Sequence, residues 1–351
     1  MSEVNLDREY KVASLRNFLD PVIPGGIVGD LQMHLISGGR SNPTYRLSDD
    51  TRQWILRRQP FGQVLETAHD MGREYRVITA LHDTGVAVPQ TLVHCADPNI
   101  IGSTFYVMTD LGGITMRNVT DTSIMTVDER GRLAEAMVKT LVNLHQLDPA
   151  SIGLADFGRP DGYLERQVRR WRKQWDASHL VSRPHVYLLL DRLGASVPET
   201  VYPGLIHGDF KVDNVMVDHA DRGRLLGVLD WEMSTLGDTL ADVGTLLSFW
   251  DEEDSPFNPV SAGTTAHQGF PSHDAIRERY AQLRGIELPN LDWYLVLAYV
   301  KVAIIMEQIH VRHEAGLTVG EGFDDAGAMV DPLLDKAMKV ASVSDVPGLR
   351  V

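Results

Sequence analysis

The chain has 351 residues, of which 43% are hydrophobic, and it carries a formal net charge of -15 at pH 7. This length is enough for one bilobal unit or two domains with a large buried core, and the negative charge argues against a nucleic-acid partner because it repels phosphate backbones. The single cysteine, Cys95, excludes an internal disulfide and a cysteine metal cluster, and it fits a reducing cytoplasm.

The first nine residues contain four charged side chains and lack the apolar core of a signal peptide, so we expect a cytoplasmic protein (Glu3, Asp7, Arg8, Glu9). Five segments then show the composition and turn boundaries of β-strands. One helix, from about Ala68 to Leu81, carries Met71, Tyr75 and Ile78 on one face. The sequence therefore predicts a five-stranded antiparallel sheet with one helix, the strands being 32–37, 44–47, 53–58, 91–95 and 104–109.

From Thr126 onward the apolar residues recur with helical spacing. Thr126 and Glu129 form a capping box at the start of one helix, and Leu164, Val168, Trp171 and Trp175 share one face of another. A sheet-rich segment followed by a mainly helical one is an α+β arrangement. We expect residues 1–111 to form a nucleotide-binding lobe and residues 112–351 a catalytic and substrate lobe, with the cleft between them as the ligand site.

The longest apolar helix candidate runs from Leu291 to His313. Lys301 and Glu307 interrupt it, so its uninterrupted apolar run falls short of the roughly twenty residues that a membrane span needs. We therefore expect a buried helix of the larger lobe and no membrane partner.

The segment from His207 to Glu232 carries the chemistry. Asp209 is followed by Lys211 and Asn214, and a predicted hairpin of two short strands, centred near Arg222, leads on to Asp230. Antiparallel pairing would bring Asn214 and Asp230 side by side, where an amide oxygen and a carboxylate suit Mg²⁺.

Asp209 would then lie at the rim of this metal site and accept a proton from an attacking hydroxyl, while Lys211 would offset charge on the transferred phosphoryl group. Each residue alone is more commonly a turn, capping or surface residue. Their joint spacing favours a kinase.

These motifs resemble the aminoglycoside phosphotransferase-like family of small-molecule kinases, and most closely the kinase domain that is fused to acyl-CoA dehydrogenases in animals and stands alone in many bacteria. The resemblance runs from about residue 35 to residue 245. It implies a protein-kinase-like fold, ATP with Mg²⁺ as cofactors and a small hydroxylated substrate, with GTP as an alternative nucleotide and the number of subunits open. The further matching motifs are Ser41–Tyr45, Leu56–Pro60, Arg73–Ile78, Phe105–Met108 and Arg166, Gln167, Arg170, Trp171 and Gln174.

The nucleotide would bind to the first lobe. Gly38 and Gly39 lie between two predicted strands, followed by Ser41 and Asn42, and glycines let backbone N–H groups approach phosphates. By itself such a pair is more often a simple hairpin turn. The resemblance assigns it to nucleotide binding.

Kinases usually place a lysine on the third strand, and this chain has Leu56-Arg57-Arg58 there instead. Strand alternation puts Arg57 and Arg58 on opposite faces, and we assign Arg57 to the phosphates, with Glu74 as its partner. The fifth strand leads into a predicted hinge in which Met108 is a core residue and the backbone groups of Thr109 and Leu111 read the purine edge.

Other residues have supporting roles under this interpretation. We expect His207 to brace the catalytic loop and Glu232 to support the metal ligands, and either Asp238 or Asp242 to support the loop. The acidic run Asp251–Asp254 would suit a polycation such as an aminoglycoside if it were not simply a solvated surface.

Basic residues on two predicted helices would suit an anion, or would form ordinary salt bridges (Arg166, Arg169, Arg170, Arg172, Lys173; Lys301, His310, Arg312). We favour a hydroxy acid or hydroxyacyl thioester as the substrate. An aminoglycoside or amino-alcohol substrate, and a catalytically silent binding module, are the alternatives.

Overall fold

The computed structural model describes residues 3–36, 42–60, 70–253, 258–316 and 325–351. The chain divides into two compact units: unit 1 comprises Met1–Gly113 and Leu226–Glu232, and unit 2 comprises Ile114–Leu225 and Met233–Val351. The segment Leu226–Glu232, which the sequence analysis gave to the second lobe, thus groups with the first unit.

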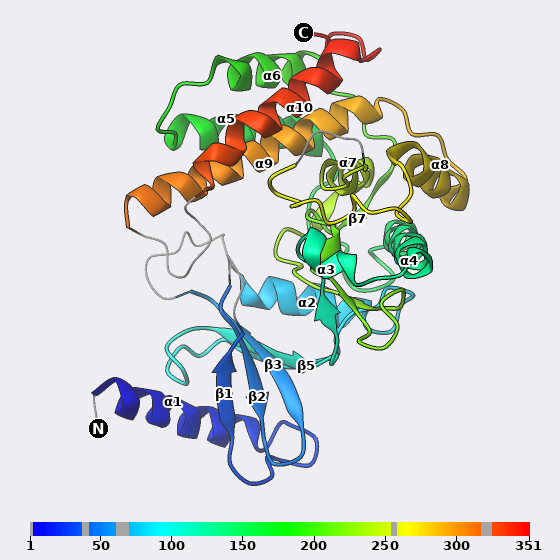
Figure 1. Cartoon of the computed structure of the whole chain (residues 1–351). Helices are drawn as coiled ribbons and strands as arrows, with labels where there is room; N and C mark the ends of the chain where they lie inside the picture. The colour runs from blue at the N-terminus through cyan, green and yellow to red at the C-terminus, as the bar shows by residue number, and fades with distance from the viewer. Residues whose placement is uncertain (1–2, 37–41, 61–69, 254–257, 317–324) are drawn as a thin grey trace. The chain divides into compact units, whose positions relative to one another are not determined.

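Unit 1 contains the predicted five-stranded sheet, in the order β1-β2-β3-β5-β4, with every neighbouring pair antiparallel. The predicted ends agree with the structure to within two residues. Figure 1 shows this sheet with helix α1 lying across it. The strands are β1 (Gln32–Leu35), β2 (Thr44–Ser48), β3 (Gln53–Arg58), β4 (Thr91–Cys95) and β5 (Phe105–Thr109).

The expectation of a single helix in this unit was wrong, because α1 (Glu3–Leu19) also packs on the sheet. Leu15 and Leu19, one helical turn apart, are buried in a core shared with Trp54 and Leu56 of β3. Burying two leucines contributes roughly 3–6 kcal/mol, which is enough to dock the helix. Val12 and Phe18 are partly buried against the same core, so the apolar stripe extends over residues 12–19.

Helix α2 (Met71–Leu81) begins with Asp70, whose side chain accepts a hydrogen bond from the Arg73 N–H. The predicted start near Ala68 lies outside the described residues. The buried residues of α2 include Met71, Val77 and Ile78, and one charged residue, Glu74, lies among them. A buried carboxylate on an apolar helix face requires a partner, and the site described below supplies it.

Unit 2 is mainly helical, as expected, and it also contains a few short strands. The predicted capping box is present at the start of α4, and the four predicted apolar residues of α5 are all buried. Two short 3₁₀ turns (Val212–Asn214 and Gly327–Met329) accompany the helices, which are α3 (Val119–Ser123), α4 (Val127–Gln146), α5 (Tyr163–Ala177), α6 (Pro184–Ala195), α7 (Leu240–Ser248), α8 (His273–Arg284), α9 (Leu291–Glu314) and α10 (Val330–Val343).

Helix α9 is the central helix of unit 2 and runs alongside α10 (Figure 1). Its length and apolar composition are sufficient for a membrane span, contrary to our estimate from the sequence, but 67% of its most apolar window is buried inside the protein. The interrupting Glu307 is fully buried and binds the Arg183 guanidinium at 2.8 Å and the Leu180 N–H at 2.8 Å. The structure therefore accommodates α9 as a core helix.

The strands of unit 2 are β6 (Ile114–Thr115), which pairs with β8 (Val215–Val217), and β7 (Pro203–Ile206), which pairs with β10 (Thr235–Asp238). The predicted hairpin strands are present as β8 and β9 (Leu225–Val228), and the Asp218 N–H donates to the Arg224 carbonyl to close the turn.

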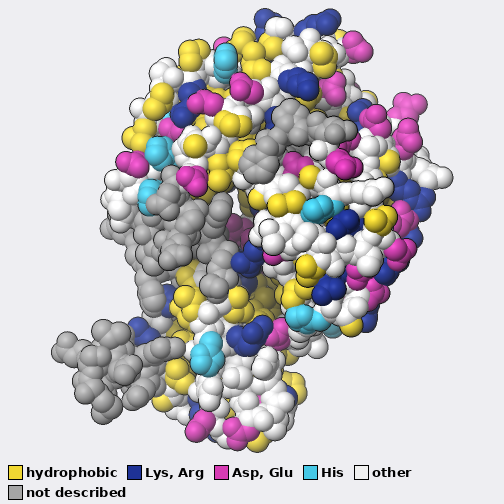
Figure 2. All heavy atoms as spheres, in the orientation of Figure 1, with side chains coloured by type: hydrophobic (Ala, Val, Ile, Leu, Met, Phe, Trp, Pro, Cys, Tyr) yellow, Lys and Arg dark blue, Asp and Glu magenta, His cyan; other side chains and the backbone are white. Residues whose placement is uncertain are grey.

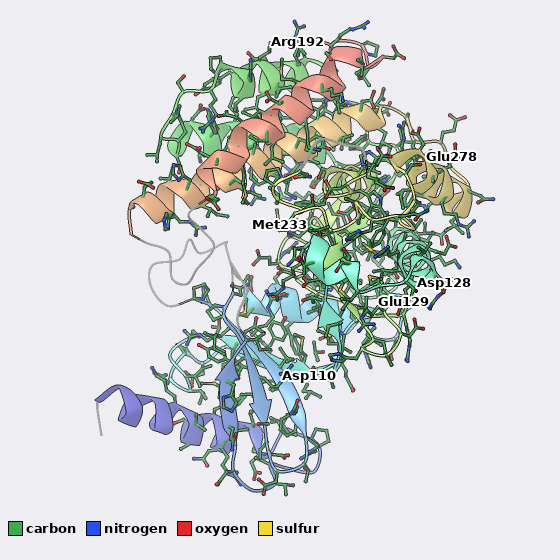
Figure 3. All side chains as sticks on the ribbon, in the orientation of Figure 1. Asp110, Asp128, Glu129, Arg192, Met233 and Glu278 are labelled. Atoms are coloured by element: carbon green, nitrogen blue, oxygen red, sulfur yellow. The ribbon has the colours of Figure 1, made fainter. Side chains whose placement is uncertain are left out.

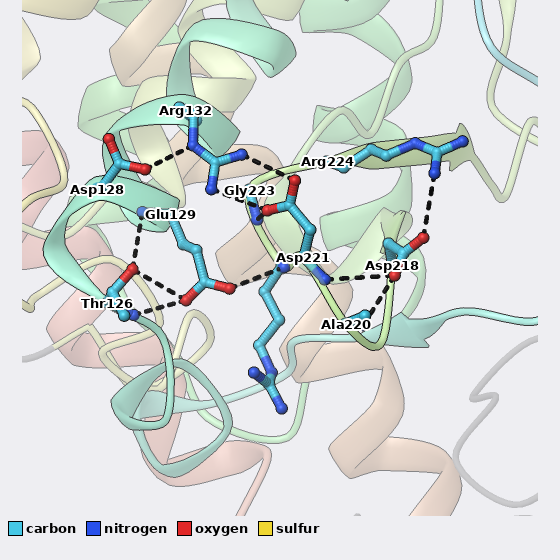
Figure 4. A network of polar contacts seen from close by, with 10 residues as sticks. Thr126, Asp128, Glu129, Arg132, Asp218, Ala220, Asp221, Gly223 and Arg224 are labelled. Carbon is cyan, nitrogen blue, oxygen red and sulfur yellow. Dashed lines mark hydrogen bonds and ion pairs between the residues drawn. The ribbon is translucent and has the colours of Figure 1, made fainter.

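Helix α4 holds this hairpin turn through polar contacts (Figure 4). One carboxylate oxygen of Glu129 accepts from the Thr126 N–H at 2.7 Å, and the other accepts from the Arg222 N–H at 3.0 Å. Arg132 binds Asp221 at 2.8 Å and Asp128 at 2.7 Å. The residue that caps α4 therefore also fixes the turn that follows the catalytic loop.

Candidate active site

The predicted catalytic loop follows β7, which ends at Ile206. One buried carboxylate binds the backbone at the start of this loop. Asp242, at the start of α7, accepts hydrogen bonds from the His207 N–H at 2.7 Å and from the Gly208 N–H at 2.8 Å. Of the two aspartates considered from the sequence, Asp242 is thus the one that contacts the loop. Asp238 instead accepts from the Leu240 N–H and the Tyr294 hydroxyl near the start of α7.

Asp242 is itself held by a chain of buried polar groups that the sequence did not reveal. His145 Nε2 lies 3.1 Å from Asp242, and its Nδ1 lies 2.7 Å from the Tyr280 hydroxyl. Burial raises the pKa of Asp242, but hydrogen bonds from His145 and the His207 backbone outweigh this and hold it below the ordinary value. Burial lowers the pKa of His145, which favours a neutral ring that donates from Nε2 and accepts at Nδ1.

Gly208 must be a glycine for two reasons. Its φ of +84° lies in the left-handed region, and a Cβ at this position would lie 2.6 Å from the Met233 carbonyl oxygen. Met233 follows the segment that carries Asp230, and its position in unit 2 is labelled in Figure 3. A side chain at position 208 would therefore push the catalytic loop away from this neighbour.

The three residues predicted to act in the loop meet at one point in unit 2. The Asn214 side-chain N–H₂ donates to the Asp209 carbonyl at 2.8 Å and to its Oδ2 at 3.0 Å, while Lys211 Nζ lies 3.1 Å from the same Oδ2. Lys211 also lies over the Phe249 ring, 4.6 Å from its centroid. The Asp209 side chain remains 21% exposed, so a substrate can reach it.

The charges around Asp209 keep it ionised. Burial raises the pKa of this carboxyl, but Lys211, Lys301 and His207 outweigh the burial and lower the pKa below its ordinary value. His207 is fully buried, and its Nδ1 accepts from the Asp209 N–H at 3.1 Å. This geometry is that of a bracing residue, as expected from the sequence.

One basic residue near the loop was considered for an anionic substrate or an ordinary salt bridge, and not as a partner of the loop backbone. Lys301, in the middle of α9, donates a hydrogen bond to the Gly208 carbonyl. The signal for it was present in the sequence, because this lysine interrupts an otherwise apolar helix.

A second cluster of predicted residues lies in unit 1. Arg57 NH1 lies 3.2 Å from Glu74 Oε1, and its NH2 lies 3.0 Å from Asp230 Oδ1. Arg57 is 9% exposed and Glu74 is fully buried, whereas the Asp230 side chain is 30% exposed. The fork of one arginine therefore bridges α2 and the segment after β9.

Burial raises the pKa of Glu74 to about 7, against the opposing attraction of Arg57. Asp230 is one of three described non-glycine residues with a positive φ, at 66°. Such a conformation costs of order 1 kcal/mol or more and is concentrated at functional sites. Next to it, Glu232 Oε2 accepts from the Asn42 side chain at 2.9 Å, so Asn42 contacts the support residue of the predicted metal motif.

The other predicted nucleotide contacts divide into three groups. Gly38, Gly39 and Ser41 lie outside the described residues. Met108 is buried in β5, and Leu111 packs against Gly227. The prediction that the Thr109 N–H reads the purine needs correction, because this group donates to the Gln90 carbonyl at 2.9 Å. The Thr109 carbonyl and the Leu111 backbone are left for that role.

Asn214 belongs to unit 2 and Asp230 to unit 1, so their predicted pairing stays a prediction. Among the described residues, no group of three or more histidines, cysteines and acidic residues could hold a metal ion. The predicted site has only one amide oxygen and one carboxylate oxygen, so it is not a group of this kind. Such a site suits Mg²⁺, which keeps waters and substrate phosphates as its other ligands.

The chain matches known proteins along most of its length. The model of the phosphotransferase enzyme family (APH) matches residues 32–293. Acyl-CoA dehydrogenase family member 11 of Gallus gallus is 35% identical over 353 residues, which cover 97% of this chain and 44% of that protein. The chain therefore spans less than half the length of this relative.

Solved structures are also similar to this chain along most of its length. A protein from Ralstonia eutropha JMP134, provisionally described as an aminoglycoside phosphotransferase, is 28% identical and has a TM-score of 0.77, with 93% of this chain and 97% of that chain covered. A thermostable mutant of APH(4)-Ia, in a ternary complex with AMP-PNP and hygromycin B, is 16% identical and has a TM-score of 0.62, with 94% and 99% covered. These matches confirm the predicted resemblance and the α+β kinase-like fold.

Proposed function

Because this chain belongs to the phosphotransferase enzyme family, we propose that it transfers the γ-phosphoryl group of ATP to a hydroxyl of a small molecule in an Mg²⁺-dependent reaction. The observation that carries this proposal is the arrangement at Asp209, an ionised and accessible carboxylate held between Lys211 and Asn214. A carboxylate so placed can orient a hydroxyl and accept its proton.

In the proposed reaction the acceptor oxygen attacks the γ-phosphorus in line with the leaving oxygen of ADP. The bond from the γ-phosphorus to the bridging oxygen breaks, and the hydroxyl proton passes to Asp209. The products are a phosphate ester and ADP. Lys211, whose ammonium lies beside Asp209, stabilises negative charge on the transferred group.

Arg57 takes the place of the usual lysine in this proposal. Its guanidinium is oriented by Glu74 and Asp230 and stays charged at any physiological pH, since the surrounding acidic groups raise its pKa despite burial. Each terminal nitrogen carries a second N–H besides the one directed at its acidic partner, and this N–H could donate to a phosphate oxygen. Asn214 and Asp230 are the candidate ligands of Mg²⁺, which would neutralise phosphate charge when bound.

We favour a hydroxy acid or a hydroxyacyl thioester as the acceptor. The lysines nearest the catalytic aspartate, Lys211 and Lys301, provide positive charge that would attract an anionic group. The relationship to acyl-CoA dehydrogenase family member 11 points in the same direction.

The described part of the acidic run gives little support to a polycationic acceptor. Asp251 is buried and accepts from the Ser261 hydroxyl at 2.5 Å, and Glu252 accepts from the His273 N–H at 2.9 Å. These two carboxylates are engaged within the protein. The basic helix α5 is also partly engaged: Arg166 donates to two backbone carbonyls, and Arg172 pairs with Asp191.

A screen for acceptor-dependent ADP release tests the function. The panel contains hydroxy acids, their CoA esters, aminoglycosides, amino alcohols and sugars, each with ATP or GTP and with or without Mg²⁺. Turnover with acyl compounds and ATP, lost without Mg²⁺, supports the proposal. A response to cationic acceptors alone would establish the alternative substrate class, and nucleotide binding without turnover on any acceptor would favour a silent binding module.

A further inference from the structure

Every backbone N–H at the start of the catalytic loop has a side-chain partner. Asp242 accepts from the His207 and Gly208 N–H groups, and the His207 ring accepts from the Asp209 N–H. The carbonyl of Gly208 has a partner as well, the Lys301 ammonium from α9. Lys301 and the loop both belong to unit 2, so this contact lies within one compact unit.

The peptide between Gly208 and Asp209 is thus held at both of its polar atoms. Its carbonyl binds Lys301, and its N–H binds His207. A planar peptide fixed at both ends cannot rotate without breaking one of these bonds. Since this peptide carries the Cα of Asp209, the direction of the carboxylate depends on it.

The setting of Lys301 favours this contact. Lys301 is itself half-buried, so its ammonium is partly withdrawn from water and gains from a hydrogen-bond acceptor. Burial lowers the pKa of Lys301, while Asp209 and Asp242 oppose this and Lys211 and Arg170 add to it. A half-buried amine is costly unless it has a partner, and the described hydrogen-bond partner of Lys301 is the Gly208 carbonyl, with the charges of Asp209 and Asp242 in its surroundings.

We propose that Lys301 is a positioning residue of the phosphotransfer reaction, which holds the Gly208–Asp209 peptide so that the Asp209 carboxylate faces the acceptor hydroxyl. The inference rests on the proposed function for its kinetic consequence. Its structural part, the clamping of the peptide, does not.

The kinetic test uses the Lys301→Met variant of the full chain, which keeps an unbranched side chain and removes the donor and the charge. With the acceptor from the screen, kcat should fall on the order of 10–100-fold, as expected for a misplaced catalytic group, while KM for ATP stays within about twofold. An unchanged kcat would overturn the proposal.

Chemical rescue separates positioning from general stability. In Lys301→Ala, added methylammonium should restore part of kcat because it can donate to the vacated carbonyl, and tetramethylammonium, which has no N–H group, should not. Lys139→Ala is the matched control, because this lysine is 54% exposed and pairs only with Glu135 among the described salt bridges. A loss of kcat that follows the loss of melting temperature and does not respond to methylammonium would make the role merely structural and overturn the proposal.

Hydrogen exchange provides a readout that needs no substrate. The amides of His207, Gly208 and Asp209 should exchange faster in Lys301→Met than in the wild type, because the peptide is released on one side. If exchange accelerates in the variant while the wild type turns over no acceptor, Lys301 does hold the Gly208–Asp209 peptide, but the proposed function is wrong. If exchange is unchanged, Lys301 does not hold this peptide and the inference is wrong.

Discussion

Asp209 is supported through both its side chain and its backbone. Two side chains contact its carboxylate, and the two peptides before it are held by Asp242, His207 and Lys301. Together these contacts fix the direction in which the carboxylate points, as the proposed role of a general base requires.

Replacing Asp209 with Asn should lower kcat by roughly two to four orders of magnitude, because the amide cannot accept the hydroxyl proton. The variant keeps the size of the side chain and should retain its melting temperature to within a few degrees. Steady-state kinetics with the identified acceptor, together with nucleotide titration, provide the measurement. Wild-type turnover in this variant would rule out the base role.

Glu74 predicts a specific pH dependence of stability. Its pKa rises from an ordinary 4.5 to about 7 in the folded chain because of burial. The folded state therefore holds its proton more tightly than the unfolded state, so the contribution to stability is full below about pH 4.5 and is lost as the pH rises through about 7.

In Glu74→Gln this group no longer titrates. The difference in melting temperature between wild type and variant should change steadily between pH 5 and 7.5, with the wild type losing stability relative to the variant. Thermal unfolding across this range measures it. A difference that stays constant with pH would contradict the prediction.

Among the helices, α4 contacts the turn of the β8–β9 hairpin through a residue that also caps the start of α4. Glu129 accepts from Thr126 at the helix start and from Arg222 in the hairpin turn (Figure 4). We expect Glu129→Ala to cost about 2 kcal/mol of unfolding free energy and Thr126→Ala about 1 kcal/mol.

Lys139→Ala is the control, because this lysine on the same helix is 54% exposed and pairs with Glu135 of that helix. Its cost should stay within about 0.5 kcal/mol. Chemical denaturation of the three variants gives the comparison. Equal losses for Glu129→Ala and Lys139→Ala would show that the contact of Glu129 with the hairpin turn adds nothing.

The elements also show what local sequence can predict. The five strands were found because each has the right length and turn boundaries, and alternation placed Arg57 and Arg58 on opposite faces of β3. Helix α1 was missed although Val12, Leu15, Phe18 and Leu19 recur with helical spacing, because this stripe extends over only about two turns.

Contacts between residues far apart in the sequence were harder to predict. Lys301 lies 93 positions from Gly208, and His145 lies 97 positions from Asp242. No spacing rule relates such residues, so only the folded arrangement of α4, α7 and α9 reveals them. The Thr109 N–H was misassigned for the same reason, since its partner belongs to another segment.

For the whole molecule, the net charge of -15 is spread over a mixed surface. On the face in Figure 2, acidic and basic side chains are interspersed over the described part of unit 2. A phosphorylated ligand must therefore rely on local contacts, of which Mg²⁺ would be one.

Binding of a nucleotide should accordingly stabilise the protein only when the metal is present. AMP-PNP at about 100 times its dissociation constant adds about 2.7 kcal/mol, and most of this should require Mg²⁺. Asp230→Asn should lose the Mg²⁺-dependent part of the melting-temperature shift, while the exposed-site control Asp128→Asn keeps it. Equal shifts in the presence of EDTA and Mg²⁺ would exclude the metal role.

The discontinuity of unit 1 has a consequence for synthesis on the ribosome. Arg57 and Asn42 are made early, but their partners Asp230 and Glu232 belong to a segment that is translated far later. At about 5–20 residues per second, roughly 6–24 s pass between the emergence of residue 113 and that of residue 232. During that interval the nascent sheet contains Arg57 without Asp230, one of its two acidic partners, so residues 1–113 should depend on chaperone protection until residues 226–232 have been made.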